Sequence, residues 1–180
     1  MDSSKPAGSI TLRAAESRDI PAITRIYADA VINGTASFEL TPPDEAEMAR
    51  RHTALVDNGY PYFVAELSDT IAGYAYAGPY RTRPAYNWTV EDSIYIAPQF
   101  HRRGIGLVLL KRLIAESERR GYRQMIAVIG DSAQTASIGV HTAAGFAPVG
   151  VFRAIGFKHG KWLDTPLMQL TLGKGDTAPP

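Results

Sequence analysis

Alternating and continuous runs of apolar residues mark the strands that the sequence predicts. Residues 10–14 alternate apolar and polar side chains. Residues 125–129 form an unbroken apolar run, which is typical of a strand buried on both faces. Similar runs, separated by turn-forming Gly, Pro, Ser and Asp, complete the set. The predicted strands are residues 10–14, 62–67, 71–77, 90–96, 125–129, 146–154 and 162–172.

Apolar positions spaced three and four apart predict helices. The first has Asp19 as its cap and Pro21 near its start, and ends at Asn33-Gly34. The second opens at Pro43-Asp-Glu and stops near Asn58-Gly59, with His52 expected on its solvated side. Two further helices are predicted over about 104–120 and 133–144, each followed by glycine.

The order of these elements is β, α, α, β, β, β, α, β, α, β, β, which predicts an α/β (α+β) fold with helices on the faces of a mixed sheet. A length of 180 residues fits one domain. We assign that domain to residues 10–173. The ends, 1–9 and 174–180, are rich in Ser, Gly, Pro and Asp and are predicted to be flexible.

Composition and charge exclude several classes of function. The balance of 19 Lys and Arg against 18 Asp and Glu argues against a nucleic-acid-binding surface. No apolar run reaches eighteen residues, and the start of the chain lacks a signal-peptide pattern, so we expect a cytoplasmic protein without a membrane partner. The absence of cysteine removes disulfides and thiolate zinc sites, and His, Asp and Glu show no metal-ligand spacing.

The most informative local motif is residues 94–106, Ile-Tyr-Ile-Ala-Pro-Gln-Phe-His-Arg-Arg-Gly-Ile-Gly. A strand, two arginines and Gly-x-Gly precede a long helix, whose free amides and dipole attract anions. No Gly-Lys-Ser/Thr is present, and Leu109 stands where a dinucleotide fingerprint needs glycine. The motif alone leaves two interpretations open, a pyrophosphate site and a glycine-rich turn with solvated arginines.

This motif resembles motif A of the GNAT acetyltransferases, which binds the pyrophosphate of acetyl-CoA. The segment 134–146 resembles the superfamily's Asn-x-x-Ser-x-x-Leu-Tyr/His-x-x-x-Gly-Phe helix, and 86–96 and 156–164 resemble the phosphinothricin and methionine sulfoximine N-acetyltransferases. The resemblance implies a mostly antiparallel sheet of about seven strands with a splayed middle and about four helices. His101 and Gln134 depart from the family pattern, so we expect rearranged coenzyme contacts there.

The resemblance also implies acetyl-CoA as co-substrate and a set of coenzyme-binding residues. A backbone N–H on the splayed strand 94–96 is a candidate donor to the oxyanion of the reacting carbonyl. The implied coenzyme-binding residues are Ile94, Tyr95, Ile96, Arg102, Arg103, Gly104, Ile105, Gly106, Leu107, Gln134 and Ser137.

Two side chains are candidates for proton transfer. Glu91 lies among apolar neighbours, where a carboxylate acquires the raised pKa that suits a general base, and it matches the glutamate that the family uses. The alternative is an exposed strand residue paired with arginine. Asp92 should face the opposite side of the strand and is the weaker candidate. His141, at the position of the family's thiolate-protonating Tyr or His, is equally compatible with a packed helix histidine.

The acceptor site is expected from charge and from the resemblance. Arg81 and Arg83 share one loop and can clamp an anionic group, while Phe38 and Lys158 lie in segments that the family places near the acceptor. Lys158 could equally be solvated and Phe38 could belong to the core. The expected function is acetylation of an amino-acid-like acceptor by a homodimer. The alternatives are another amine, such as a peptide N-terminus or polyamine, and a non-catalytic CoA-binding module.

Overall fold

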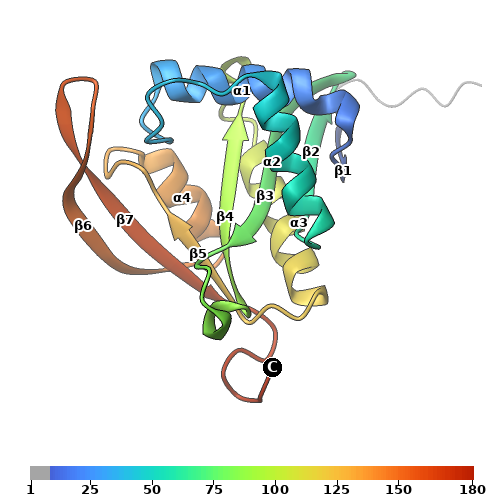
Figure 1. Cartoon of the computed structure of the whole chain (residues 1–180), viewed down its shortest axis with the longest axis vertical. Coiled ribbons are helices and arrows are strands. Elements are labelled where there is room, and N and C mark those ends of the chain that lie inside the picture. Colours follow the sequence, from blue (N-terminus) through green and yellow to red (C-terminus); the bar gives the residue numbers. More distant parts are fainter. Residues whose placement is uncertain (1–8) are drawn as a thin grey trace, which may run out of the picture.

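In a computed structural model that describes residues 9–180, seven strands form one mixed sheet in the order β1-β2-β3-β4-β5-β7-β6 (Figure 1). All neighbouring strands are antiparallel except β4 and β5, which run parallel. The predicted fold class is therefore confirmed. The strands are β1 (Ile10–Ala14), β2 (Tyr62–Leu67), β3 (Thr70–Pro79), β4 (Thr89–Ile96), β5 (Gln124–Val128), β6 (Ala147–Lys158) and β7 (Lys161–Thr171).

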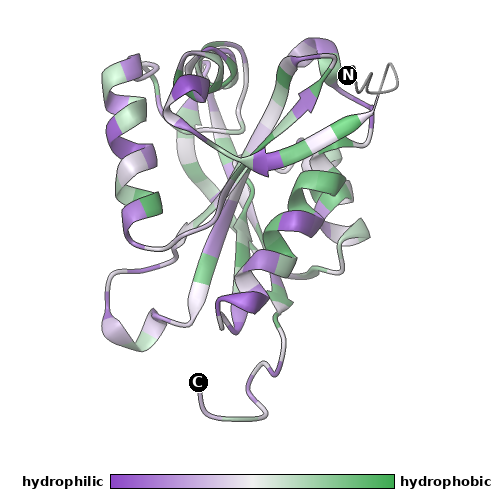
Figure 2. Ribbon diagram, turned by 90° about the vertical axis from the view of Figure 1, so that its right-hand side faces the viewer, coloured by the Kyte–Doolittle hydropathy of each residue, from purple (hydrophilic) through white to green (hydrophobic). Residues whose placement is uncertain are grey.

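Two helices cover each face of the sheet, and each pair encloses a separate apolar core. One core joins α1 and α2 to Val64, Tyr74 and Ala97. The other joins α3 and α4 to the opposite side of the strands and centres on Leu109 and Met125. Hydrophobic and hydrophilic residues alternate along these elements (Figure 2). The helices are α1 (Ile20–Asn33), α2 (Glu45–Asp57), α3 (Ile105–Arg119) and α4 (Thr135–Ala143).

The parallel junction in the middle of the sheet is short. Pairing between β4 and β5 is confined to residues 89–91 of β4 and 124–126 of β5, although β4 continues to Ile96. The two strands separate beyond this point, which is the splayed middle that the family resemblance implied. The prediction that residues 125–129 are buried on both faces is wrong for Val128, which is 39% exposed at the separation.

The β6–β7 hairpin is longer than the sequence predicted and extends at one side of the molecule (Figure 1). The first of its strands continues past residue 154 because a bulge, with Ala154 at φ 49°, lets it change register and go on pairing with β7. Its apolar side chains are exposed on this edge strand, unlike those of the inner strands.

Two side chains occupy places other than those predicted. Asp19 precedes α1 but does not cap it, because its carboxylate accepts hydrogen bonds from Arg13 at 2.6 and 2.7 Å and from the Glu16 N–H at 2.8 Å. His52 is buried rather than solvated, and its ring packs edge-on against Tyr62 at 4.9 Å.

The predicted flexible N-terminus, 1–9, lies outside the described residues except for Ser9. At the other end, residues 173–176 form a turn, and Arg123 donates a hydrogen bond to the Pro179 carbonyl at 2.9 Å. Among residues 9–180, no helix combines the length and apolarity needed to span a membrane. The same part of the chain holds no cluster of three or more His, Asp or Glu side chains suited to a metal ion.

Candidate active site

A cavity of about 350 Å³ opens where β4 and β5 separate. Its walls come from β4, the end of β5, the start of α4 and the loop 34–40 between α1 and α2. Glu91, His141, Gln134, Ser137 and Phe38, all candidate site residues, lie in these walls. The separation of two parallel strands therefore brings together side chains from segments far apart in the sequence.

Glu91 is the partly buried carboxylate of this cavity. On the same strand, Tyr95 packs in the core beside α1, whereas Ile94 and Ile96 pack in the core beside α3. Successive side chains of a strand point to opposite faces of the sheet, so Glu91 lies on the α1 side and Asp92 on the α3 side. Burial and, to a smaller extent, the charge of Asp92 raise the pKa of Glu91 to about 7, although the charge of Arg81 opposes the shift. Such a carboxylate accepts a proton at neutral pH, which suits a general base.

Asp92 and His141 form a buried pair that the sequence analysis did not identify. Oδ2 of Asp92 lies 2.9 Å from Nε2 of His141, and the two side chains are only 2% and 6% exposed. The other ring nitrogen, Nδ1, lies 2.8 Å from the Ser137 carbonyl. The prediction that Asp92 faces away from Glu91 is consistent with this pairing. A partner 49 positions away left no local pattern in the sequence.

The hydrogen bonds of His141 fix where its protons lie. A carbonyl oxygen can only accept, so Nδ1 carries a proton, and a second proton lies between Nε2 and the Asp92 carboxylate. Burial alone would lower the pKa of His141, but the hydrogen bond and charge of Asp92 outweigh it and raise that pKa. The geometry therefore places a shared proton between Asp92 and His141 beside the cavity, and both imidazole nitrogens contact acceptors.

The loop before α3 has the geometry of an anion site. Arg102 and Gly104 adopt left-handed conformations, with φ of 60° and 77°, and a methyl group built on Gly104 would meet nothing within 4 Å. The Val108 N–H donates to the Gly104 carbonyl, so the amides of Ile105, Gly106 and Leu107 precede the first helical hydrogen bond. Exposed Arg102 and Arg103 add positive charge at this open helix start.

The unpaired side of β4 presents backbone amides to the opening. The Ala97 N–H donates to the Ala72 carbonyl on β3 at 2.9 Å. Because peptide groups alternate in direction along a strand, the N–H groups of Ile94 and Ile96 point the other way, toward β5. The side chain of Tyr95 instead joins the α1 core and meets Tyr27 edge-on at 5.0 Å.

The two residues that depart from the family pattern both bond within the protein. His101 Nε2 lies 2.9 Å from the Ile96 carbonyl. Gln134 donates from Nε2 to Thr35 Oγ1 at 3.0 Å, which links α4 to the loop 34–40. Each of these side chains already has a partner within the protein, and the rearranged coenzyme contacts expected at the two positions stay a prediction.

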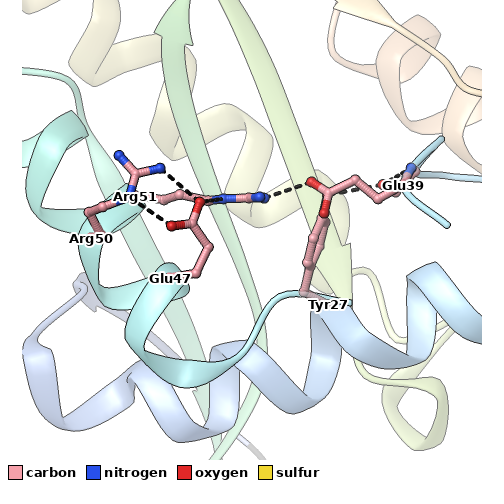
Figure 3. A network of polar contacts seen from close by, with 6 residues as sticks. Tyr27, Glu39, Glu47, Arg50 and Arg51 are labelled. Carbon is pink, nitrogen blue, oxygen red and sulfur yellow. Dashed lines mark hydrogen bonds and ion pairs between the residues drawn. The ribbon is translucent and has the colours of Figure 1, made fainter. Parts of the chain in front are cut away.

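A network of polar contacts holds the outer side of the loop 34–40 (Figure 3). Tyr27 Oη lies 2.9 Å from Ser37 Oγ and donates to Glu39 at 2.9 Å. Arg51 on α2 bridges Glu39, at 2.6 Å, and Glu47, at 2.7 Å. The network therefore joins α1, the loop and α2, and it fixes one wall of the cavity.

The expected acceptor-binding residues occupy different environments. Phe38 lines the cavity, so it is not a core residue. Lys158 is buried rather than solvated, and its Nζ donates to the Ser37 carbonyl at 2.6 Å. Arg81 and Arg83 are exposed and stand outside the walls of the cavity, although the charge of Arg81 reaches Glu91.

Comparisons with known proteins agree with the fold. The family model described as an acetyltransferase (GNAT) domain matches residues 12–167. Phosphinothricin N-acetyltransferase from Alcaligenes faecalis is 52% identical over 94% of this chain and 86% of its own. L-methionine sulfoximine/L-methionine sulfone acetyltransferase from Pseudomonas paraeruginosa is 38% identical over 95% and 99%. The crystal structure of a GNAT superfamily phosphinothricin acetyltransferase from Sinorhizobium meliloti, in complex with AcCoA, superposes with a TM-score of 0.92, at 49% identity over 95% of this chain and 92% of that one.

Proposed function

Because the chain belongs to the GNAT family of acetyltransferases, we propose that it acetylates the α-amino group of an amino-acid-like acceptor, of the phosphinothricin or methionine sulfoximine type, with acetyl-CoA as co-substrate. The observation that carries the acid–base part of the proposal is Glu91, a partly buried carboxylate whose pKa is raised to about 7 in the cavity. The names of relatives 52% and 38% identical support the acceptor class.

The residues around the start of α3 fit the coenzyme. The open surface at Gly104 leaves room for a phosphate against the backbone, and Ile105, Gly106 and Leu107 supply amides that lack intrahelical acceptors. Arg102 and Arg103 supply the charge. The unpaired amides of Ile94 and Ile96 can bind the extended arm and its carbonyl oxygen, and Gln134 and Ser137 line the far wall.

Direct transfer needs three events from the chain's own residues. Glu91, acting through water, takes a proton from the acceptor amine. A backbone N–H of β4 donates to the carbonyl oxygen as it gains charge. As the amine nitrogen bonds to the carbonyl carbon, the carbon–sulfur bond breaks, and the departing CoA thiolate takes a proton either from the pair of Asp92 and His141 or from water. Holding the two substrates in one cavity supplies much of the rate.

Recognition of an amino acid requires a cation for its carboxylate. Arg81 and Arg83 lie in the loop that follows β3, ahead of the strand that carries Glu91, and we assign them this clamp. Phe38 forms the apolar boundary of the site, and Lys158 holds the backbone beside it.

We propose that the protein is a homodimer joined at the β6–β7 hairpin. This edge exposes large apolar side chains, of the kind that one copy can bury against another. They are Val149, Val151, Phe152, Ile155, Phe157 and Trp162. Light scattering on Trp162→Glu tests the assignment, because a dimer through this face should become a monomer.

The experiment that tests the function is a thiol-release assay with acetyl-CoA and an acceptor panel. Phosphinothricin and methionine sulfoximine should be acetylated with higher kcat/KM than a peptide N-terminus or spermidine. A preference for either of the latter would change the acceptor class and leave the family assignment intact. Acetyl-CoA binding without thiol release on any acceptor would instead indicate a non-catalytic CoA-binding module.

A further inference from the structure

Gly156 on β6 lies directly against the ring of Phe38. A methyl group built on Gly156 would stand 2.2 Å from Phe38 Cε2 and 2.6 Å from Cδ2, far inside van der Waals contact. Gly156 does not have the positive φ of a left-handed residue. The lack of space, rather than the backbone conformation, therefore requires glycine at this position.

The backbone that leads into Phe38 is held by contacts that resist its displacement by such a methyl group. Lys158 donates to the Ser37 carbonyl at 2.6 Å, and His159 Nε2 lies 3.1 Å from the Gly34 carbonyl. The same loop also packs against Gly130, where an added methyl group would stand 2.3 Å from the Thr35 carbonyl oxygen. The movable part of the contact is therefore the Phe38 ring.

The bulge in β6 brings Gly156 to this place. Ala154 adopts a left-handed conformation and donates its N–H to Asp164 Oδ1 at 2.9 Å. The register of the hairpin changes between Phe152 and Gly156, so that Gly156 pairs with Leu163. The glycine is thus positioned by a specific irregularity of the hairpin rather than by regular pairing.

We propose that the contact between Gly156 and Phe38 determines how long an acceptor side chain the enzyme accepts. Phe38 lines the cavity and Gly156 does not, so the ring separates the glycine from the acceptor space. A larger residue at 156 displaces the ring toward the cavity and shortens that space. The proposal rests on the proposed function, because it assumes an amino-acid acceptor in this cavity.

The test compares Gly156→Ala with Gly150→Ala, using methionine sulfoximine as the long acceptor and alanine as the short one. A methyl group at Gly150, on the same strand, would meet nothing within 4 Å, so this variant is the matched control. In Gly156→Ala the ratio of kcat/KM for the long acceptor over the short one should fall about tenfold, the scale of one misplaced methylene in an apolar pocket. The ratio in Gly150→Ala and the KM for acetyl-CoA in both variants should stay at the wild-type values.

Phe38→Ala completes a double-mutant cycle. Without the ring, adding Gly156→Ala should leave the acceptor ratio unchanged, and this double variant remains testable even if Gly156→Ala alone fails to fold. An unchanged ratio in folded Gly156→Ala, or an equal fall of the ratio in the Phe38→Ala background, would overturn the inference. Failure of the wild type to acetylate any amino acid would overturn the proposed function instead.

Discussion

Replacing Glu91 by Gln removes the proposed base while keeping the size of the side chain. Turnover should fall by roughly 10²–10⁴-fold, the usual contribution of a positioned general base. The wild-type kcat/KM should rise with pH through about 7 as Glu91 loses its proton, and this acid limb should disappear in the variant. Acetyl-CoA affinity should change little, because the carboxylate is placed to act on the acceptor amine.

The same substitution should stabilise the fold at high pH. The pKa of Glu91 rises from its ordinary 4.5 to about 7 on folding, mainly because burial disfavours the charged carboxylate. Below pH 4.5 both states are protonated, whereas at higher pH the unfolded state ionises first, so the wild type loses stability between 4.5 and 7. A tenfold change in proton affinity corresponds to about 1.4 kcal/mol, so the free energy of unfolding falls by at most about 3.5 kcal/mol over this range.

Urea unfolding of wild type and Glu91→Gln at pH 4.5, 6 and 8 measures this difference. The stability gain of the variant should be small at pH 4.5 and largest at pH 8. Glu45→Gln, at an exposed glutamate in the first turn of α2, is the control and should show no such growth. A Glu91→Gln difference that does not change with pH would refute the assigned burial, and wild-type turnover in the variant would refute the assigned base.

Three further predictions address coenzyme, acceptor and leaving group. Gly106→Val should weaken acetyl-CoA binding in calorimetry at least tenfold in a folded protein; unchanged affinity would move the pyrophosphate elsewhere. Arg81→Ala and Arg83→Ala should each raise the acceptor KM about tenfold, because a charge-assisted hydrogen bond contributes about 1.5–3 kcal/mol. The KM for acetyl-CoA should not change, and an unaltered acceptor KM in both variants would exclude the clamp. If the pair of Asp92 and His141 protonates the thiolate, His141→Gln should lower kcat. This loss should be smaller with an acetyl thioester of a more acidic thiol, because such a thiolate leaves without needing a proton. A loss that does not depend on the thiol would assign the proton to water.

Periodicity predicted most of the fold because the elements bury one side each. Ile23, Ile26 and Val31 repeat at helical spacing and do fill the core under α1. The β6–β7 hairpin was underestimated because its first strand is an exposed edge, so its apolar residues follow no buried face, and its bulge depends on a left-handed Ala154. Burial of His52 escaped prediction for a different reason, because only the packing of α2 on the sheet places its ring against Tyr62.

Local motifs predicted the parts of the site that are continuous in the chain. The start of α3 follows directly from Gly-x-Gly and the preceding strand. By contrast, the bond between Asp92 and His141 spans 49 positions, and the one between Lys158 and the Ser37 carbonyl spans 121. Contacts of this kind depend on strand order and on the register of the hairpin, so the type of residue at one position does not predict its distant partner.

The short junction between β4 and β5 also has a mechanical consequence. Strand pairing joins β1–β4 to β5–β7 only at residues 89–91 of β4, so the sheet has a seam at its centre where backbone hydrogen bonds are few. An extended ligand bound along the open part of this seam would act as an additional strand, because it would form hydrogen bonds with peptide groups of β4 that have no neighbouring strand. Occupancy should therefore stiffen the whole sheet, and slowed hydrogen exchange at the amides of Ile94 and Ile96 would report it.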